Sequence, residues 1–286
     1  QAESLPETVL AVAEARLATL DPEARRLLRA ASVFGERFAA RGVAHLAQDE
    51  EAEANMGLLV AAEVLERRVD ADGRATGEYA FRHALLRDAA YASLTDADRQ
   101  LGHRLAAEWL EASGRTEPVV IAQHLDLAGE PARAVAWYRR AAGASMARCD
   151  LDGVISAVDR ALALGPAPEL EGGLQLAVAR ARFWRGDMFT AEQHGLAALP
   201  RLPPSDARWL AAATITCAAA LTRAREQPVD PALIEAMFEH TPSAETRATY
   251  VHACGDLVVT FLTAGKHALA RRALARLRTE IGRAHV

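Results

Sequence analysis

Apolar residues recur every three or four positions through the first third of the chain, which is the spacing of amphipathic helices. A capping box at Ser4 to Glu7 starts the first helix, and Asp21-Pro22 starts the second, which stops at Gly35. Two short β-prone runs then flank an Asp72-Gly73 turn. The pattern predicts helices at about 6–20, 22–34, 39–47, 51–67 and 83–94, and strands at about 69–74 and 78–81.

Beyond residue 96 the pattern becomes one of helices in pairs, marked by small residues at repeated offsets. Gly129 with Ala134 is the first instance, and the pattern starts again at Cys149, Gly186 and Gly265. Glycine turns the chain between two antiparallel helices, and alanine lets them approach closely. The predicted helices are at about 97–112, 117–128, 131–147, 151–164, 170–185, 188–199, 206–224, 231–239, 244–263 and 267–282.

The long interval from Gly186 to Gly265 predicts one further helix pair between them. The helix-breaking pairs Gln227-Pro228 and Asp230-Pro231 place its inner turn.

Three helices followed by a hairpin are typical of a winged-helix domain, and stacked helix pairs are typical of an α-α superhelix. We therefore predict a mainly α protein with a small β hairpin. A winged-helix domain would occupy residues 1–96, and a solenoid of helical repeats would occupy residues 97–286. The concave face of such a solenoid binds peptides or protein surfaces.

Composition agrees with close-packed helices, since hydrophobic residues make up 51% of the 286 residues and aromatic residues only 5%. No apolar run reaches the ~20 residues of a membrane span, and no signal peptide opens the chain. Three scattered cysteines, Cys149, Cys217 and Cys254, form no Cys-x-x-Cys pair. We expect reduced thiols in a cytoplasmic protein with no membrane and no metal.

Charge argues against DNA binding by the first domain. Residues 1–96 contain 11 Arg against 17 Asp plus Glu, a net charge of −6. The helix in the recognition position begins beside the acidic run 49–53. DNA affinity comes largely from basic side chains that neutralise phosphates, so we expect no direct DNA binding by this chain.

The stretch from Glu78 to Tyr91 is the candidate functional motif. A β-prone run passes directly into an amphipathic helix, with His83 at the junction. The first N–H groups of a helix are unpaired and its dipole is positive there, so the junction suits an anion. His83 can add a donor to a phosphate; the alternative is a structural histidine that caps the junction.

The same stretch resembles the winged-helix segment of the STAND signalling ATPases, the class that includes the NB-ARC proteins. The resemblance implies that His83 senses the β-phosphate of bound ADP, although Ala84 follows it where the family has an acid. The glycine and alanine offsets of the second part resemble tetratricopeptide repeats. Segments 99–106 and 121–125 are similar to the junction in bacterial members of the group that carry such repeats.

No phosphate-binding loop occurs in the sequence, because the single lysine, Lys266, is followed by His267 and lacks the upstream glycine. We therefore expect no enzyme activity and no cofactor in this chain itself. The resemblance implies the regulatory part of a longer ATPase that binds ADP and ATP. Its partners would be an upstream nucleotide-binding module and a protein or small-ligand inducer on the repeats, with oligomerisation on activation.

Two alternatives stay open. The repeats can form an interaction scaffold in which His83 is structural, or the chain can belong to a transcription regulator whose DNA-binding domain lies outside it. The remaining histidines show no metal-binding spacing. Four tryptophans at apolar helical positions are expected in the core: Trp109, Trp137, Trp184 and Trp209.

Overall fold

The computed structural model describes residues 7–114, 117–223, 230–244 and 246–284. The described residues form 15 α-helices and one three-stranded antiparallel sheet, so the predicted class, mainly helical with a small β hairpin, is confirmed. The chain divides into two compact units, 1–134 and 135–286, with the boundary inside helix α8 (Pro131–Ala147). The predicted division into domains at residue 96 stays a prediction.

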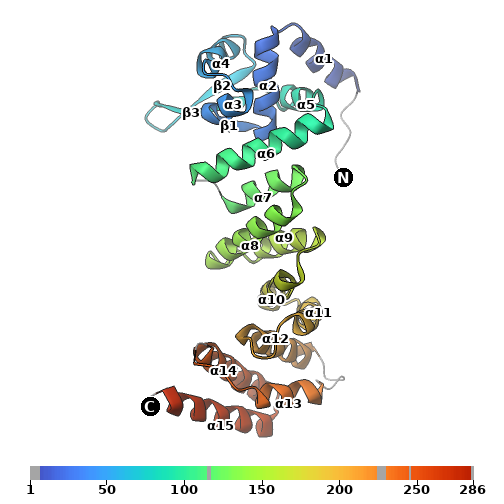
Figure 1. The fold of residues 1–286 in the computed structure, drawn as a ribbon, viewed down its shortest axis with the longest axis vertical. Helices are drawn as coiled ribbons and strands as arrows, with labels where there is room; N and C mark the ends of the chain where they lie inside the picture. Colours follow the sequence, from blue (N-terminus) through green and yellow to red (C-terminus); the bar gives the residue numbers. More distant parts are fainter. Residues whose placement is uncertain (1–6, 115–116, 224–229, 245, 285–286) are drawn as a thin grey trace. The chain divides into compact units, whose positions relative to one another are not determined.

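The first unit combines α-helices with the small sheet (Figure 1). Its elements are α1 (Glu7–Ala18), α2 (Pro22–Phe34), β1 (Arg37–Ala39), α3 (Ala40–Ala47), α4 (Ala52–Ala61), β2 (Leu65–Val69), β3 (Ala75–Phe81), α5 (Ala84–Ala92), α6 (Asp96–Ser113) and α7 (Pro118–Leu127).

Helix α2 buries six of its 13 residues, and its ends are set locally. The Asp21 carboxylate accepts a hydrogen bond from the Ala24 N–H at 2.8 Å, and Pro22 occupies the first turn. Gly35 stops the helix at φ 103°, a conformation that favours glycine. The capping box predicted at Ser4 lies outside the described residues.

The sheet has the order β1-β3-β2 and buries its aromatic residues against the helices. Phe38 on β1 pairs with Tyr79 on β3, and the two rings stack at 6.4 Å. Leu65 on β2 pairs with Phe81. Strand β1 was not predicted, since three residues are too few to show an alternating pattern.

Two predictions around the hairpin are wrong. The helix predicted at 51–67 ends at Ala61, and the chain turns at Glu63 with φ 58°. Val64 and Leu65 continue the apolar helical spacing, but they are buried at the sheet, Leu65 as part of β2. The first strand is therefore 65–69 rather than 69–74, and the turn follows it, where the Asp70 carboxylate accepts N–H bonds from residues 72 and 74.

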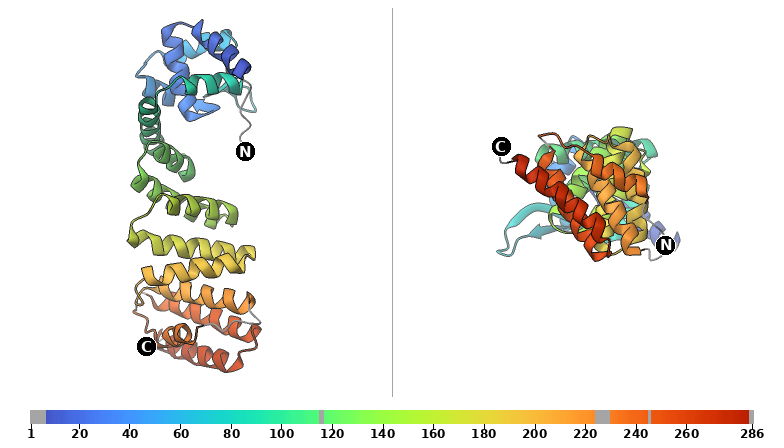
Figure 2. Two further views of the ribbon diagram at one scale, coloured as in Figure 1. Left: turned by 90° about the vertical axis from the view of Figure 1, so that its right-hand side faces the viewer. Right: turned by 90° about the horizontal axis from the view of Figure 1, so that it is seen from below.

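The second unit is a stack of consecutive helices, seen from the side in Figure 2. Its elements after α8 are α9 (Leu151–Ala163), α10 (Pro168–Arg185), α11 (Met188–Ala198), a 3-10 turn (Leu199–Arg201), α12 (Ala207–Arg223), α13 (Pro231–Glu239), α14 (Arg247–Thr263) and α15 (His267–Ala284). The helix pair predicted between Gly186 and Gly265 is present as α12 and α13. Asp230 caps α13; Gln227-Pro228 lies outside the described residues.

Small residues lie at the turns and crossings, as the sequence predicts. Gly186 and Gly265 turn the chain with φ of 90° and 70°. Cys149 adopts the same left-handed conformation, φ 57°, before α9. Ala191 is fully buried on α11, which packs against both α10 and α12.

Enlarging Ala191 should therefore destabilise the second unit. Ala191→Leu adds three carbons at a helix crossing, and overpacking of this kind costs about 1–3 kcal/mol. Ala268→Leu, on the exposed face of α15, is the matched control and should change the free energy of unfolding little. Urea unfolding followed by circular dichroism measures both, and equal small effects would show that Ala191 is not at a tight crossing.

Candidate functional site

His83 lies between strand β3 and helix α5, as the motif predicts. It is the N-cap residue of α5, with extended backbone angles of φ −135° and ψ 128°. Its side chain is exposed and makes no capping hydrogen bond. The imidazole is therefore accessible to a partner at the positive end of α5.

The backbone just before His83 is held by hydrogen bonds beside the sheet. The Phe81 N–H donates to the Glu36 carbonyl, and the Arg82 N–H donates to the Val64 carbonyl, each at 3.0 Å. Behind it, Leu86 is buried in the core of the first unit. The histidine thus stands on a fixed junction, which is how a donor is preorganised for an anion.

This junction supplies only some of the donors that a bound phosphate needs. It offers the imidazole and the first N–H groups of α5, and the nearby Arg82 guanidinium is paired with Glu63 at 3.3 Å. A phosphate site on His83 would therefore need further groups from another module. ADP sensing by His83 stays a prediction.

A second candidate site is an open groove of about 530 Å³ in the second unit. Its walls come from α10, α12 and α14. These are the first helices of the consecutive pairs α10–α11, α12–α13 and α14–α15. Trp184 is 70% exposed there and Val259 is 60% exposed. The Thr222 and Thr263 hydroxyls donate to carbonyls of their own helices, at 2.7 Å and 3.0 Å. The groove therefore presents mostly apolar surface.

The expectation that Trp184 belongs to the core is wrong. It occupies the next-to-last position of α10, and its ring meets Phe183 edge-on at 6.0 Å. Its apolar spacing along α10 is the same as for a core residue, so the sequence pattern alone could not separate the two environments. An exposed tryptophan beside other apolar side chains is typical of a protein-binding surface.

The first unit also contains a buried histidine pair that sequence spacing did not reveal. The Nδ1 atoms of His103 on α6 and His124 on α7 lie 2.9 Å apart, and the Tyr91 hydroxyl lies 2.8 Å from His103 Nε2. Burial lowers the pKa of His103 to about 4. Burial, with a smaller contribution from the charge of His103, lowers the pKa of His124 to about 4. The pair is therefore neutral at pH 7.

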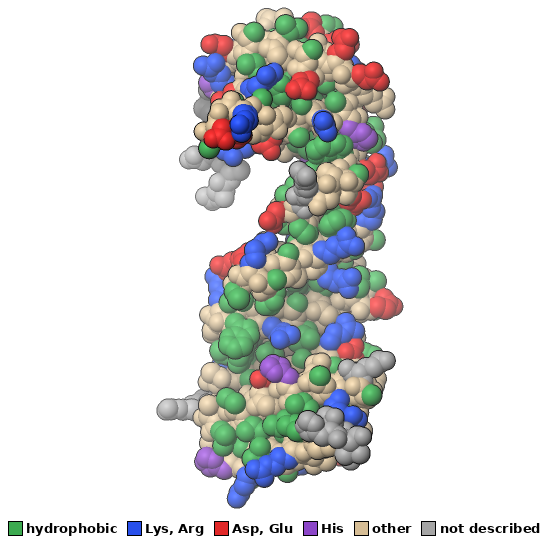
Figure 3. Space-filling model, turned by 90° about the vertical axis from the view of Figure 1, so that its left-hand side faces the viewer, with side chains coloured by type: hydrophobic (Ala, Val, Ile, Leu, Met, Phe, Trp, Pro, Cys, Tyr) green, Lys and Arg blue, Asp and Glu red, His purple; other side chains and the backbone are tan. Residues whose placement is uncertain are grey.

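Charges elsewhere are mixed rather than grouped. Acidic and basic side chains are interspersed on the face drawn in Figure 3. On α15, Arg272 forms an ion pair with Glu235, and Arg276 donates to the Tyr250 hydroxyl at 3.1 Å and to the His240 carbonyl at 2.8 Å. These two arginines are engaged within the unit.

Within the described part of the chain, no group of three or more acidic, histidine or cysteine side chains is placed to hold a metal ion. None of the described helices combines the length and low charge needed to cross a bilayer.

No protein-family model and no curated protein matches the sequence. Among solved structures, the chain is similar to a STAND protein (signal transduction ATPase with numerous domains) with a tetratricopeptide repeat sensor, from Pyrococcus horikoshii. The match covers the whole of this chain with 11% identity and a TM-score of 0.39, so the likeness is loose. The chain spans about half the length of that protein, 48%.

Proposed function

We propose that this chain is the non-catalytic regulatory and sensor region of a STAND-type signal transduction ATPase. The first unit would hold the resting, ADP-bound state through His83. The paired helices would bind a protein or small-ligand inducer. Binding that favours the open conformation would then shift the population toward ATP exchange and oligomerisation.

The observation that carries the sensor role is the groove beside Trp184. Three consecutive helix pairs each contribute their first helix to one apolar surface, so a single extended ligand can contact all of them. The groove volume of about 530 Å³ falls in the range of ligand-binding clefts. The large exposed tryptophan provides the type of anchor that dominates binding energy in interfaces.

The regulatory role rests on the junction at His83 and on the absence of a phosphate-binding loop from this sequence. An exposed imidazole on a rigid helix start suits a contact with an anion supplied by a neighbouring module. The acidic balance of residues 1–96 disfavours DNA as the partner of the first unit. An interaction scaffold, the main alternative, would use the same groove but would not respond to nucleotide.

Removing the tryptophan anchor should weaken peptide binding in the groove. Peptides selected from a random display library against this chain should carry an apolar anchor, and Trp184→Ala should weaken their binding about 30-fold, since hot-spot truncations cost about 2 kcal/mol or more. Fluorescence anisotropy with a labelled selected peptide measures the Kd.

Phe189→Ala is the matched control, because Phe189 is a 53% exposed aromatic residue on α11 outside the groove lining. Binding that survives Trp184→Ala, or that is lost equally in Phe189→Ala, would exclude this groove as the sensor surface.

A further inference from the structure

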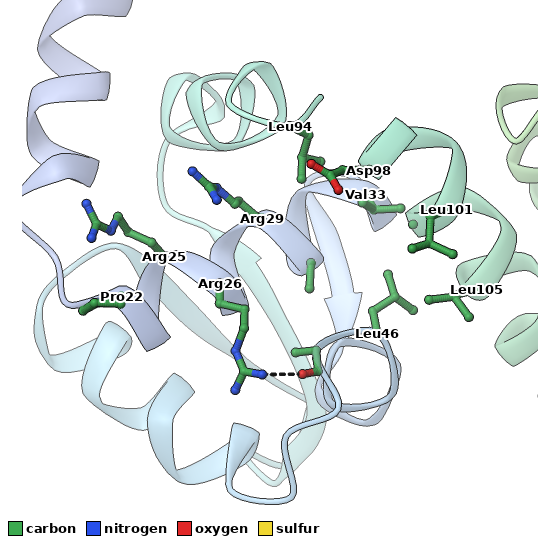
Figure 4. Close-up of a pocket in the computed structure, with 13 residues that line it drawn as sticks. Pro22, Arg25, Arg26, Arg29, Val33, Leu46, Leu94, Asp98, Leu101 and Leu105 are labelled. Atoms are coloured by element: carbon green, nitrogen blue, oxygen red, sulfur yellow. Dashed lines mark hydrogen bonds between the residues drawn. The ribbon is translucent and has the colours of Figure 1, made fainter. Parts of the chain in front are cut away.

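The first unit contains an open cavity of about 610 Å³ between α2 and α6 that neither His83 nor the groove uses. The end of α3 and the residue Leu94, after α5, complete its walls. Figure 4 shows that its two ends differ: arginine side chains of α2 lie at one end, and Val33, Leu46, Leu101 and Leu105 lie at the other.

The arginines are Arg25, Arg26 and Arg29. They are three of the 11 arginines in residues 1–96, a segment whose net charge is negative. Arg26 is neutralised, because it pairs with Glu23 at 2.5 Å and donates to the Ala47 carbonyl at 2.8 Å. Arg29 donates from Nε to the uncharged Ser93 hydroxyl at 3.0 Å, which leaves its terminal nitrogens available.

Arg25 and Arg29 are the uncompensated charges of the cavity. They are four residues apart on α2, so they project from the same face. No carboxylate of the described residues forms an ion pair with either of them. Both arginines also line a smaller cavity of about 170 Å³, and the exposed Glu14 is another residue of its lining.

The acidic residue that lines the larger cavity, Asp98, already has hydrogen-bond partners. The Asp98 carboxylate accepts hydrogen bonds from the Thr95 hydroxyl at 2.8 Å and from the Thr95 N–H at 3.3 Å, as part of the capping box of α6. An incoming anion would therefore meet two guanidinium groups that have no carboxylate partner and one carboxylate that is held at a helix start.

From this arrangement we infer that the cavity is a binding site for a small amphiphilic anion. A phosphate or carboxylate head would bind Arg25 and Arg29, and an apolar body would lie along Val33, Leu101 and Leu105. Guanidinium groups bind both head groups in bidentate geometry. The volume is in the range of small-molecule sites.

This site is separate from the proposed phosphate contact of His83. The nine residues of α5 extend about 14 Å. His83 stands before the first of them, and Ser93, which bonds Arg29, follows the last. An anion at Arg29 and a phosphate at His83 would thus bind at opposite ends of the same helix, so either can fail without the other.

The test uses octyl phosphate, which combines an anionic head with an apolar body. Isothermal titration of this chain should show saturable binding, with inorganic phosphate and octanol each binding at least about tenfold more weakly. Octanoate, in a parallel titration, distinguishes a carboxylate preference from a phosphate preference. Arg29→Gln should weaken binding about tenfold or more, since it removes a charged hydrogen bond.

Arg104→Gln, an exposed arginine on α6 outside the cavity, is the matched control and should bind as the wild type does. Arg25→Gln serves as a second variant that leaves the Ser93 contact intact. Thermal unfolding by circular dichroism checks that each variant is folded. Three results would overturn the inference. They are no binding of either octyl phosphate or octanoate, an affinity for inorganic phosphate equal to that for octyl phosphate, and an affinity for octyl phosphate that is unchanged in both folded variants.

Discussion

Lowering the pH from 7.5 to 5 should destabilise the first unit by about 2–4 kcal/mol through the buried pair His103 and His124. Both have a pKa of about 4 in the folded protein and an ordinary value of 6.5. The unfolded chain therefore binds more protons between pH 6.5 and 4. The stabilisation is complete above pH 6.5 and is lost as the pH falls toward 4.

The geometry explains why protonation is unfavourable there. The two Nδ1 atoms share one hydrogen bond at 2.9 Å, so one ring must accept while the other donates. Two protonated rings would put two donors and two positive charges face to face. The Phe34 ring packs against His124, and Arg99 lies over the Tyr91 ring, so no carboxylate among these contacts offsets the charge.

Hydrogen–deuterium exchange read by mass spectrometry measures this loss of stability locally. The protection of peptides from α6 and α7 is compared at pH 7.5 and pH 5, after correction for the pH dependence of intrinsic exchange. Local measurement is needed because burial also lowers the pKa of His240 in the second unit. The double variant His103→Leu/His124→Leu should lose the pH dependence of this protection. His252→Gln, at an exposed position, should keep it. Wild-type protection that is the same at both pH values would contradict the prediction.

Helix positions could be predicted because their signals are local. Asp21, Thr95, Asp150, Asp187 and Asp230 each cap the helix that follows them in the structure. A cap and its helix lie within four residues of each other, so the sequence contains the whole interaction. The paired helices of the second unit were predicted to within a few residues for the same reason.

The errors share a different cause, which is contact between distant residues. Val64 and Leu65 fit a helix or a strand equally well, and pairing with Phe81 selects the strand. The exposure of Trp184 depends on how α12 and α14 pack beside α10. His103 and His124 are 21 residues apart, and only the packing of α6 on α7 brings them together. The cavity at Arg25 and Arg29 has no sequence signature either.

The central claim is that this chain regulates nucleotide state, and His83→Ala should therefore accelerate ADP release. A hydrogen bond to a charged group contributes about 1.5–3 kcal/mol. Its loss should weaken ADP retention about ten- to a hundred-fold and raise basal signalling. The exposed position of His83 and its missing capping bond mean that the substitution should leave the fold intact.

The decisive measurement is the dissociation rate of fluorescently labelled ADP from the longer ATPase of which we propose that this chain is a part. His45→Ala, at an exposed position on α3 of the same unit, is the matched control, and circular dichroism verifies folding. The account predicts release about ten- to a hundred-fold faster in His83→Ala and unchanged in His45→Ala. Unchanged ADP release in a folded His83→Ala variant would contradict it and would leave His83 as a structural residue.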